Sequence, residues 1–274
     1  MIIHLNDYKL SECPGGCERT IDTLTTILPD QVTATAKDDV SGDLYVLHNI
    51  RTFTDEQLRA YIDKPHVMWS HDIMDTDRMG LKRELIDTAM ANIFLSPGHL
   101  GRFELQAGFD MPNAHCLPSV IDTSQLVEQT KAIYKEPCYI GGIYEHKGID
   151  DVLLWARANK TIVYFFGWGD EAIIDKIISS KYGEYCGVAD KDQLSKVYSE
   201  FETLIHLPQV YEACGRSIIE AYLSGLKIIT NNNTGFFSYP WDFDNRSEIR
   251  EYLEAVPHEY LWIIEQCAYT GNII

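Results

Sequence analysis

Two carboxylates, Glu212 and Glu220, lie eight positions apart in the stretch Leu207–Gly235. On one continuous helix, at about 100° per residue, they would lie roughly 80° apart and would not share a face. A helix that begins near Gly215 instead leaves Glu212 in the preceding loop and Glu220 about one turn inside. Both then lie near a helix N-terminus, where backbone N–H groups favour an anion such as a phosphate. Because carboxylates repel that anion, we expect them to bind the hydroxyls of a ligand that carries it, such as a nucleotide sugar.

Other polar residues follow strand-like segments elsewhere in the chain. Gly15 and Gly16 follow the first apolar segment, His71 follows HVMWS, and Lys147 lies in the loop after CYIGG. Ligands of open α/β sheets bind beyond the carboxyl ends of the strands, so we expect these loops to face one crevice. Taken singly, each residue has an ordinary alternative: a tight turn, a structural histidine or a solvated lysine.

Short strand-like segments alternate with helix-period segments along the whole chain, which predicts βαβ units and parallel sheets. About ten strands are expected: MIIHL, DLYVLHN, HVMWSH, NIFLS and HCLPSV in the first half, then CYIGGI, TIVYFFG, YCGV, TLIHL and KIIT. Ten strands exceed one small sheet. We therefore predict an α/β protein with two Rossmann-like domains that face a central cleft, in a compact version of that architecture.

The predicted domains are residues 1–130, on the acceptor side, and 131–274, on the donor side, with the change-over near Gln129–Pro137. The last segment, SEIREYLEAVPHEYLWIIEQC, is expected to form two helices broken at Pro257, because proline removes a helix hydrogen bond. The C-terminal helix is expected to pack back on the N-terminal domain.

The second half resembles the retaining glycosyltransferases of the two-domain GT-B architecture, of the family 4 (group 1) type. The family patterns G-R-L-x-x-x-K-G, G-x-G and E-x-F-G-x-x-x-x-E-A correspond here to Gly141–Gly148, Gly167–Gly169 and Glu212–Ala221, and the E-x7-E spacing holds. Their order and intervals fit across residues 138–235. In the first half, Pro14–Glu18 resembles the family's glycine loop and Ser70–Asp72 its strand-end histidine.

The resemblance implies a role for each matching residue. Glu212 would bind the hydroxyls of the donor sugar, Glu220 the ribose, and Lys147 the leaving diphosphate, while His71 would approach the sugar from the first domain. Donor binding is further assigned to backbone groups at the glycines and helix start: Gly15, Gly16, Gly142, Cys214, Gly215 and Arg216.

One departure from the family concerns charge, because Gly142 stands where the family has a phosphate-binding arginine. We hypothesise that Arg216 supplies the missing cation. The implied reaction retains the anomeric configuration, needs no cofactor besides the nucleotide sugar, and requires no metal. Zinc at Cys13 and Cys17 is not expected, since no second ligand pair lies nearby in the sequence.

Several alternatives stay open. A metal-dependent GT-A-type glycosyltransferase would use an Asp-x-Asp pair, either Asp75–Asp77 or Asp242–Asp244. A nicotinamide-dependent oxidoreductase would use Gly167–Ala172, which satisfies G-x-G-x-x-A. A sugar-nucleotide epimerase and a non-catalytic nucleotide-sugar binder also fit the same residues.

The charge composition limits the kinds of molecule that this protein is expected to bind. The net charge is −18, and neither half is basic, with 10 Lys/Arg against 20 Asp/Glu in residues 1–130 and 13 against 21 in the rest. Binding through a broad basic face to nucleic acid or anionic membrane is therefore disfavoured. A saccharide or other small hydroxylated acceptor suits this surface best, with a modified DNA base as the alternative.

Seven scattered cysteines and the lack of an apolar run of about 18 residues predict a cytoplasmic protein with reduced thiols and no integral membrane segment.

Overall fold

The structure is a computed structural model that describes residues 1–13, 15–28, 30–72, 78–126 and 132–270. The chain divides into two compact units. Unit 1 comprises Met1–Ile121, Ser238–Trp241 and Glu251–Ile274, and unit 2 comprises Asp122–Phe237 and Asp242–Arg250. The predicted division between residues 130 and 131 falls within 127–131, outside the described residues.

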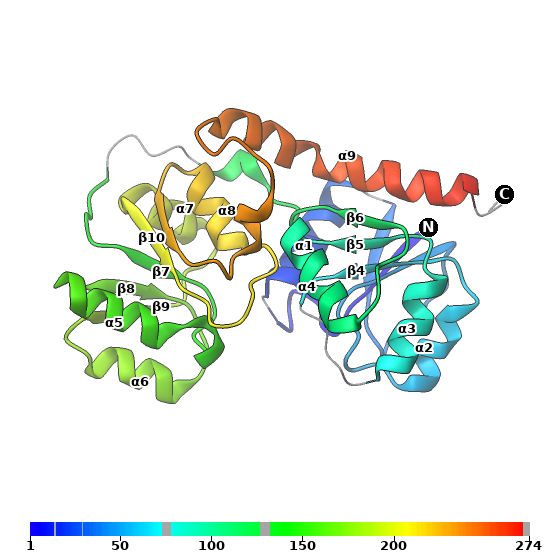
Figure 1. The fold of residues 1–274 in the computed structure, drawn as a ribbon, viewed down its shortest axis with the longest axis horizontal. Helices are drawn as coiled ribbons and strands as arrows, with labels where there is room; N and C mark the ends of the chain where they lie inside the picture. The colour runs from blue at the N-terminus through cyan, green and yellow to red at the C-terminus, as the bar shows by residue number, and fades with distance from the viewer. Residues whose placement is uncertain (14, 29, 73–77, 127–131, 271–274) are drawn as a thin grey trace. The chain divides into compact units, whose positions relative to one another are not determined.

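Unit 1 contains a parallel sheet of six strands in the order β2-β1-β3-β4-β5-β6 (Figure 1). The strands are β1 (Ile2–Leu5), β2 (Gln31–Ala34), β3 (Leu44–Leu47), β4 (His66–Ser70), β5 (Asn92–Phe94) and β6 (Ala114–Cys116). Its helices are α1 (Gly16–Ile27), α2 (Asp55–Ile62), α3 (Met79–Thr88) and α4 (Pro97–Ala107). β2 was not among the expected strands, because QVTA contains no apolar run and lies at the sheet edge, where Val32 is 40% exposed.

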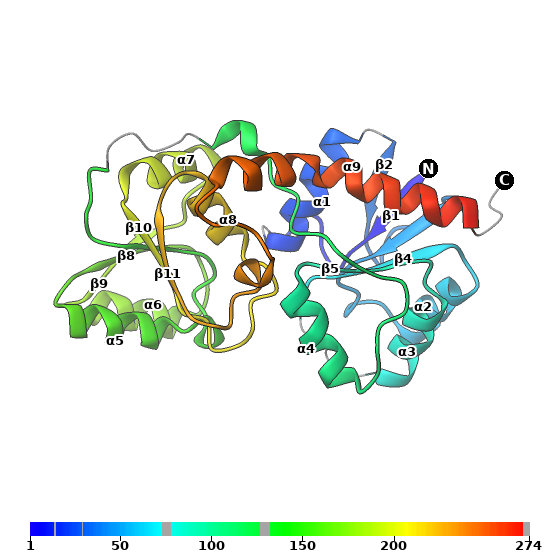
Figure 2. The same ribbon diagram turned by 45° about the horizontal axis from the view of Figure 1, so that its top comes forward.

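Alternate residues of these strands face opposite sides of the sheet. Ile3, Leu5 and Met68 pack with residues of α2, α3 and α4 in one apolar cluster. The residues between them, such as His4 and Trp69, face the other side, where Tyr260 stacks on Trp69 at 5.2 Å between ring centroids. α1 and α9 (Arg246–Thr270) lie on that second side (Figure 1 and Figure 2).

Unit 2 contains a parallel sheet of five strands in the order β11-β10-β7-β8-β9. The strands are β7 (Cys138–Ile140), β8 (Val163–Phe166), β9 (Gly183–Gly187), β10 (Thr203–His206) and β11 (Lys227–Thr230). α5 (Ile149–Asn159) and α6 (Glu171–Ser179) cover one face, and α7 (Lys191–Glu200) and α8 (Arg216–Leu223) cover the other (Figure 1). Three short 3₁₀ helices, η1 (Thr123–Gln125), η2 (Glu145–Lys147) and η3 (Gly235–Ser238), complete the described elements.

The expected break at Pro257 was wrong, because α9 runs unbroken from Arg246 to Thr270 with Pro257 inside it. An interior proline costs about 3 kcal/mol or more. The helix buries an apolar stripe at helical spacing that offsets this cost, formed by Leu253, Val256, Tyr260, Ile263, Ile264 and Cys267. Among the described helices, none has the combined length and apolar character that crossing a bilayer demands.

Candidate donor site

Helix α8 begins at Arg216, directly after Gly215, which confirms the predicted helix start. Glu212 therefore lies in the loop before the helix and Glu220 inside its second turn. Gly215 gives α8 no side-chain cap, and the same holds for Gly15 before α1 and Gly148 before α5. By contrast, side chains cap the N-termini of α2, α4, α6 and α7. Helix α3, which follows β4, has no side-chain cap either, but its N-cap is Arg78. The uncapped starts that follow a glycine are those of α1, α5 and α8, after β1, β7 and β10, and such starts favour an anion.

The structure brings two predicted residues, Lys147 and Glu212, into direct contact. Lys147 ends the 3₁₀ turn η2 that follows β7, and its Nζ donates to Glu212 Oε2 at 2.5 Å. The Glu212 backbone is fixed on both sides, since its N–H donates to Asn233 O at 2.8 Å and its carbonyl accepts from Gly235 N at 2.8 Å. A carboxylate and an ammonium group are therefore held together at the carboxyl ends of β7 and β10.

His206 also belongs to this group, although its position at the end of the apolar segment TLIHL gave no signal of it. Its ring is buried, stacks on Tyr139 with centroids 5.5 Å apart, and places Nε2 3.7 Å from Glu212 Oε2. Burial raises the pKa of Glu212, but Lys147 and His206 outweigh burial and hold the pKa well below its usual range. Glu212 is therefore an anion and a hydrogen-bond acceptor at any physiological pH.

Glu220 forms a second polar cluster with residues of α7 and α8. Tyr198 donates its hydroxyl to Glu220 Oε2 at 2.9 Å, and Arg216 donates to Oε1 at 3.2 Å. The Glu220 and Arg216 side chains are 15% and 14% exposed. The Arg216 charge therefore first compensates Glu220, which reduces the repulsion that this carboxylate would exert on an anion at the start of α8. Tyr198 was not predicted, because nothing in the pattern of α7 distinguishes it from a core residue.

The remaining predicted residues of unit 2 lie in the loops around these clusters. Cys214 is buried directly before Gly215. The carbonyl of Gly142 accepts from the Tyr139 hydroxyl at 2.8 Å. A Cβ at position 142 would lie 3.0 Å from the Tyr144 ring, so an arginine there would require Tyr144 to move.

Unit 1 places Gly15, Gly16 and His71 at the carboxyl ends of its own strands. Gly15 is the N-cap of α1 and Gly16 its exposed first residue. His71 directly follows β4, is 8% exposed, and its Nε2 lies 2.8 Å from His48 Nδ1. Burial, with smaller contributions from His99 and His4, lowers the pKa of His71 to about 3. The ring is therefore neutral at pH 7, so it can form hydrogen bonds but supplies no positive charge.

The segment Gly167–Ala172, which matches the nicotinamide-binding pattern G-x-G-x-x-A, has a structural role in this fold. The Asp170 carboxylate caps α6 by accepting from Ala172 N at 2.8 Å, which occupies the helix start that a pyrophosphate would need. A Cβ at Gly167 would overlap the carbonyl oxygen of Gly141, and one at Gly169 would overlap that of Ile143. These two glycines are thus required for close packing between neighbouring loops.

Neither Asp-x-Asp pair forms a described metal site. Asp75–Asp77 lies outside the described residues. Asp242 accepts from the N–H of Asp244 at 3.0 Å, within an exposed turn that precedes α9 and follows no strand.

Solved structures similar to this one include glycosyltransferases. HepE of Anabaena in complex with UDP and glucose shares 14% identity, with 100% of this chain and 99% of that chain covered and a TM-score of 0.67. AviGT4, a glycosyltransferase involved in avilamycin A biosynthesis, shares 11% identity over 98% of each chain at a TM-score of 0.66. The catalytic domain of starch synthase IV from Arabidopsis thaliana, bound to ADP and acarbose, shares 9% identity over 98% of this chain and 99% of that chain, also at 0.66.

These similarities confirm the predicted fold class, an α/β protein with two Rossmann-like domains of the GT-B type. No protein-family model and no curated protein matches the sequence.

Proposed function

We propose that this protein is a glycosyltransferase of the retaining, family 4 type, which moves a sugar from a nucleotide-diphosphate sugar to a hydroxyl acceptor. The observation that carries the proposal is the Lys147–Glu212 ion pair at 2.5 Å beside the uncapped start of α8. A cation and open backbone N–H groups suit a diphosphate, whereas an ionised carboxylate beside them suits sugar hydroxyls. Few ligands other than a nucleotide sugar combine both groups.

In this proposal each polar cluster binds one part of the donor. Glu212 accepts hydrogen bonds from the sugar hydroxyls, and Lys147 turns from Glu212 toward the diphosphate when the donor enters. Glu220, oriented by Tyr198, binds the ribose. Arg216 neutralises Glu220 and adds positive charge at the helix start, in place of the arginine that Gly142 replaces. His71, as a neutral imidazole, contributes a hydrogen bond to the sugar from unit 1.

The reaction breaks the bond between the anomeric carbon and the diphosphate oxygen and forms a bond from the acceptor oxygen on the same face of the sugar. The departing phosphate oxygen takes the proton of the acceptor hydroxyl, so no side-chain base is needed. Lys147 and the α8 N–H groups stabilise the negative charge that grows on the diphosphate, and such preorganised charges contribute strongly to catalysis. The proposed reaction needs no divalent metal and no further cofactor.

The donor and acceptor are assigned by chemical class. Structural neighbours were solved with UDP-glucose, with UDP and GlcNAc, and with ADP, so nucleoside diphosphate sugars of these types are the first candidates. The acceptor is a saccharide or another small hydroxylated molecule, because a net charge of −18 opposes polyanionic partners. A hydroxymethylated DNA base is the alternative acceptor. We propose that the protein acts in the cytoplasm, where nucleotide sugars are available.

The proposal is tested by a thermal-shift screen of sugar nucleotides. A donor at about 100 times its Kd stabilises the fold by about 2.7 kcal/mol, and Glu212→Gln should remove most of this gain. Stabilisation by NADH but by no sugar nucleotide would overturn the proposal in favour of an oxidoreductase.

The preferred donor is then incubated with candidate acceptors, and the product anomer is determined by NMR. Retention and activity in EDTA are expected, whereas inversion or a strict Mn²⁺ requirement would support the GT-A-type alternative. Turnover without any acceptor would indicate an epimerase, and binding without turnover a pure binder.

A further inference from the structure

Three buried histidines follow one another across unit 1, on the face of the sheet that packs against α1 and α9. In the register of the parallel strands, Ile3 pairs with Tyr45 and Leu47 pairs with Met68. Side chains alternate between faces, so His4 of β1, His48 after β3 and His71 after β4 all lie on the same side. Each is displaced toward the carboxyl end relative to the previous one. The three imidazoles therefore form a diagonal row that ends at His71, directly after β4.

The row is joined by hydrogen bonds that fix its protons. His4 Nε2 lies 2.5 Å from Gln31 Oε1, His4 Nδ1 lies 2.8 Å from His48 Nε2, and His48 Nδ1 lies 2.8 Å from His71 Nε2. An amide oxygen only accepts, so His4 donates from Nε2 and its Nδ1 accepts from His48 Nε2. The lone pair of His48 Nδ1 is thereby directed toward His71. Gln31 is three hydrogen bonds away from His71, and it fixes the direction in which every hydrogen bond of the row is donated.

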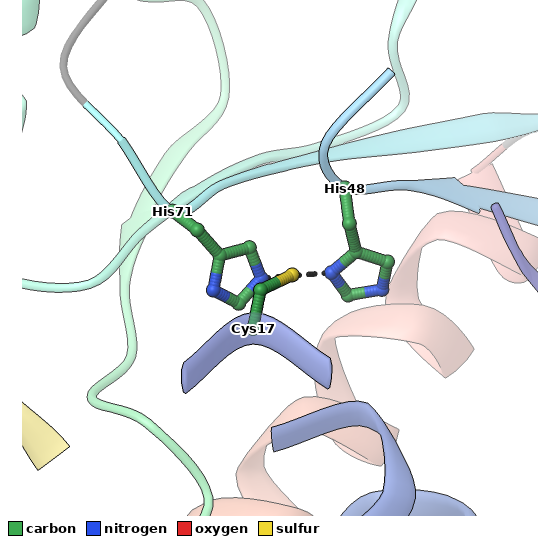
Figure 3. Close-up of side chains that lie close together, drawn as sticks. All are labelled: Cys17, His48 and His71. Atoms are coloured by element: carbon green, nitrogen blue, oxygen red, sulfur yellow. Dashed lines mark hydrogen bonds between the residues drawn. The ribbon is translucent and has the colours of Figure 1, made fainter. Parts of the chain in front are cut away.

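Cys17 brings a sulfur atom to the same place from the first turn of α1. Figure 3 shows its side chain pointing toward the rings of His48 and His71. The Cys17 Sγ and one nitrogen of each ring all lie within 4.8 Å of one another. The three residues are 7%, 5% and 8% exposed, in the order Cys17, His48 and His71. A soft sulfur and two neutral imidazoles are the ligand types that zinc and its neighbours in the first transition row select.

The surroundings of this cluster favour a cation. The carboxylates of Glu18, Asp72 and Asp7 lie near enough to Cys17 to interact with it electrostatically. Negative charges that oppose a thiolate stabilise a divalent ion bound to it, because the complex is then net positive.

We propose that Cys17, His48 and His71 form a binding site for a single transition-metal ion of the zinc type. Cys17 would bind as the thiolate, and the imidazoles through His48 Nδ1 and His71 Nε2, with a water in the fourth position. His4 and Gln31 serve as the outer shell, since a metal-bound histidine commonly donates its other N–H to a fixed acceptor.

Binding the ion requires the cluster to rearrange locally, and the Cys17 thiol gives up its hydrogen bond to Asn6 Oδ1 at 3.3 Å. Tetrahedral ligands at about 2.0–2.1 Å from the metal lie about 3.4 Å apart, so the 2.8 Å separation between His48 Nδ1 and His71 Nε2 must open by roughly half an ångström. His71 must also move its proton from Nε2 to Nδ1, which leaves its charge unchanged. The thiol of Cys17 loses its proton to solvent. One ion therefore enters and one proton leaves.

A bound metal would engage the imidazole that the proposed function assigns to the donor sugar. On that function, which this consequence rests on, metal loading inhibits transfer instead of supporting it. The site itself does not depend on the function, because metal binding is measured without any substrate.

The site is tested by titrating the full-length, reduced protein with Co²⁺. We expect one ion per chain, tetrahedral ligand-field bands and a thiolate-to-cobalt charge-transfer band, all displaced by Zn²⁺. Cys17→Ser should abolish the charge-transfer band and weaken binding by at least about 100-fold, more than the 10–100-fold typical of an outer-shell change. Gln31→Leu, which keeps all three ligands, should weaken binding by about 10-fold.

Cys13→Ser is the matched control, because it removes a thiol from the same loop and should leave the spectrum unchanged. X-ray absorption of the wild-type zinc complex, which needs no variant to fold, should show one sulfur and two imidazole ligands. A wild-type protein without a charge-transfer band, or a band that survives Cys17→Ser, would overturn the site. A metal that binds as described yet leaves turnover unchanged would contradict only the role given to His71.

Discussion

At the residue scale, the pairing of Lys147 with Glu212 is the centre of the proposed chemistry. Lys147→Met and Glu212→Gln should each lower kcat/KM for transfer by about 100-fold or more, because each removes a charge preorganised for the transition state. The double variant should lose less than the product of the two single losses, since the residues contact each other. Steady-state kinetics measures all three. Lys227→Met, which breaks an exposed 2.6 Å ion pair with Glu202 in the same unit, is the control and should change activity less than twofold.

Arg216 could act on the donor diphosphate or only hold Glu220 in place, and two substitutions of Arg216 separate these roles. If the guanidinium also supplies charge to the diphosphate, Arg216→Ala should raise the KM for the donor and lower kcat, each by about 10-fold, while Arg216→Lys recovers part of both. Tyr198→Phe removes the other partner of Glu220 and should affect the donor KM alone. Turnover and donor affinity that remain intact in Arg216→Ala would end the hypothesis that Arg216 replaces the family arginine.

At the element scale, the turn that carries Lys147 depends on Gly148. Gly148 has a φ of 72°, and a Cβ there would overlap the carbonyl oxygen of Leu207 at the end of β10. Gly148→Ala should therefore destabilise the protein by about 2 kcal/mol or more, in both backbone strain and steric overlap. Gly101→Ala is the control, because Gly101 lies inside α4 with no atom within 4 Å of the added methyl. It should stabilise the fold by about 0.5–1 kcal/mol, and urea unfolding compares the two.

The strands and helices that the sequence predicted are those with a continuous apolar or helical period. LYVL and VYFF are examples, since burial on one or both faces demands such patterns. β2 was not predicted because QVTA contains no apolar run and its one large apolar residue, Val32, is 40% exposed. The sequence did not predict that α9 continues through Pro257, because the effect of a proline is visible locally in the sequence. The stabilisation that keeps the helix intact comes from the burial of its apolar stripe, which includes Val256 and Tyr260, and such tertiary packing is not visible there.

The candidate site was predictable where residues cluster in the sequence and not where they meet only in space. Glu212, Gly215 and Glu220 share one loop and helix, so their spacing alone indicated a site. His206 lies only six positions before Glu212, but its place at the end of an apolar strand gave no indication that it contacts that carboxylate. Cys17 has no second pair of metal-ligating residues near it in the sequence. The strand order β1-β3-β4 brings His48 and His71 to it from 31 and 54 positions away.

At the scale of the whole molecule, the buried histidine row couples folding to pH. In the unfolded chain these rings titrate near 6.5, whereas burial lowers the pKa of His4 to about 4 and of His71 to about 3, and lowers that of His48 well below the usual value. Between pH 6.5 and about 4 the unfolded chain therefore binds protons that the folded chain does not. The row's stabilising contribution is complete above pH 6.5 and declines as the pH falls through this window.

The free energy of unfolding in urea should consequently fall between pH 7.5 and pH 4.5, with a slope that grows by about 1.4 kcal/mol per pH unit for each histidine involved. Glu212 has a depressed pKa too, but its unfolded value is 4.5, so its contribution is lost only at lower pH. His48→Gln removes one of the histidines that bind a proton on unfolding, so it should lower the slope by about 1.4 kcal/mol per pH unit. His258→Gln, at an exposed position of α9, should leave the slope unchanged. A wild-type unfolding free energy that is flat from pH 7.5 to 4.5 would mean that the imidazoles are protonated within the fold. Neutral rings are what the hydrogen-bonded row requires, so the titration tests that row directly.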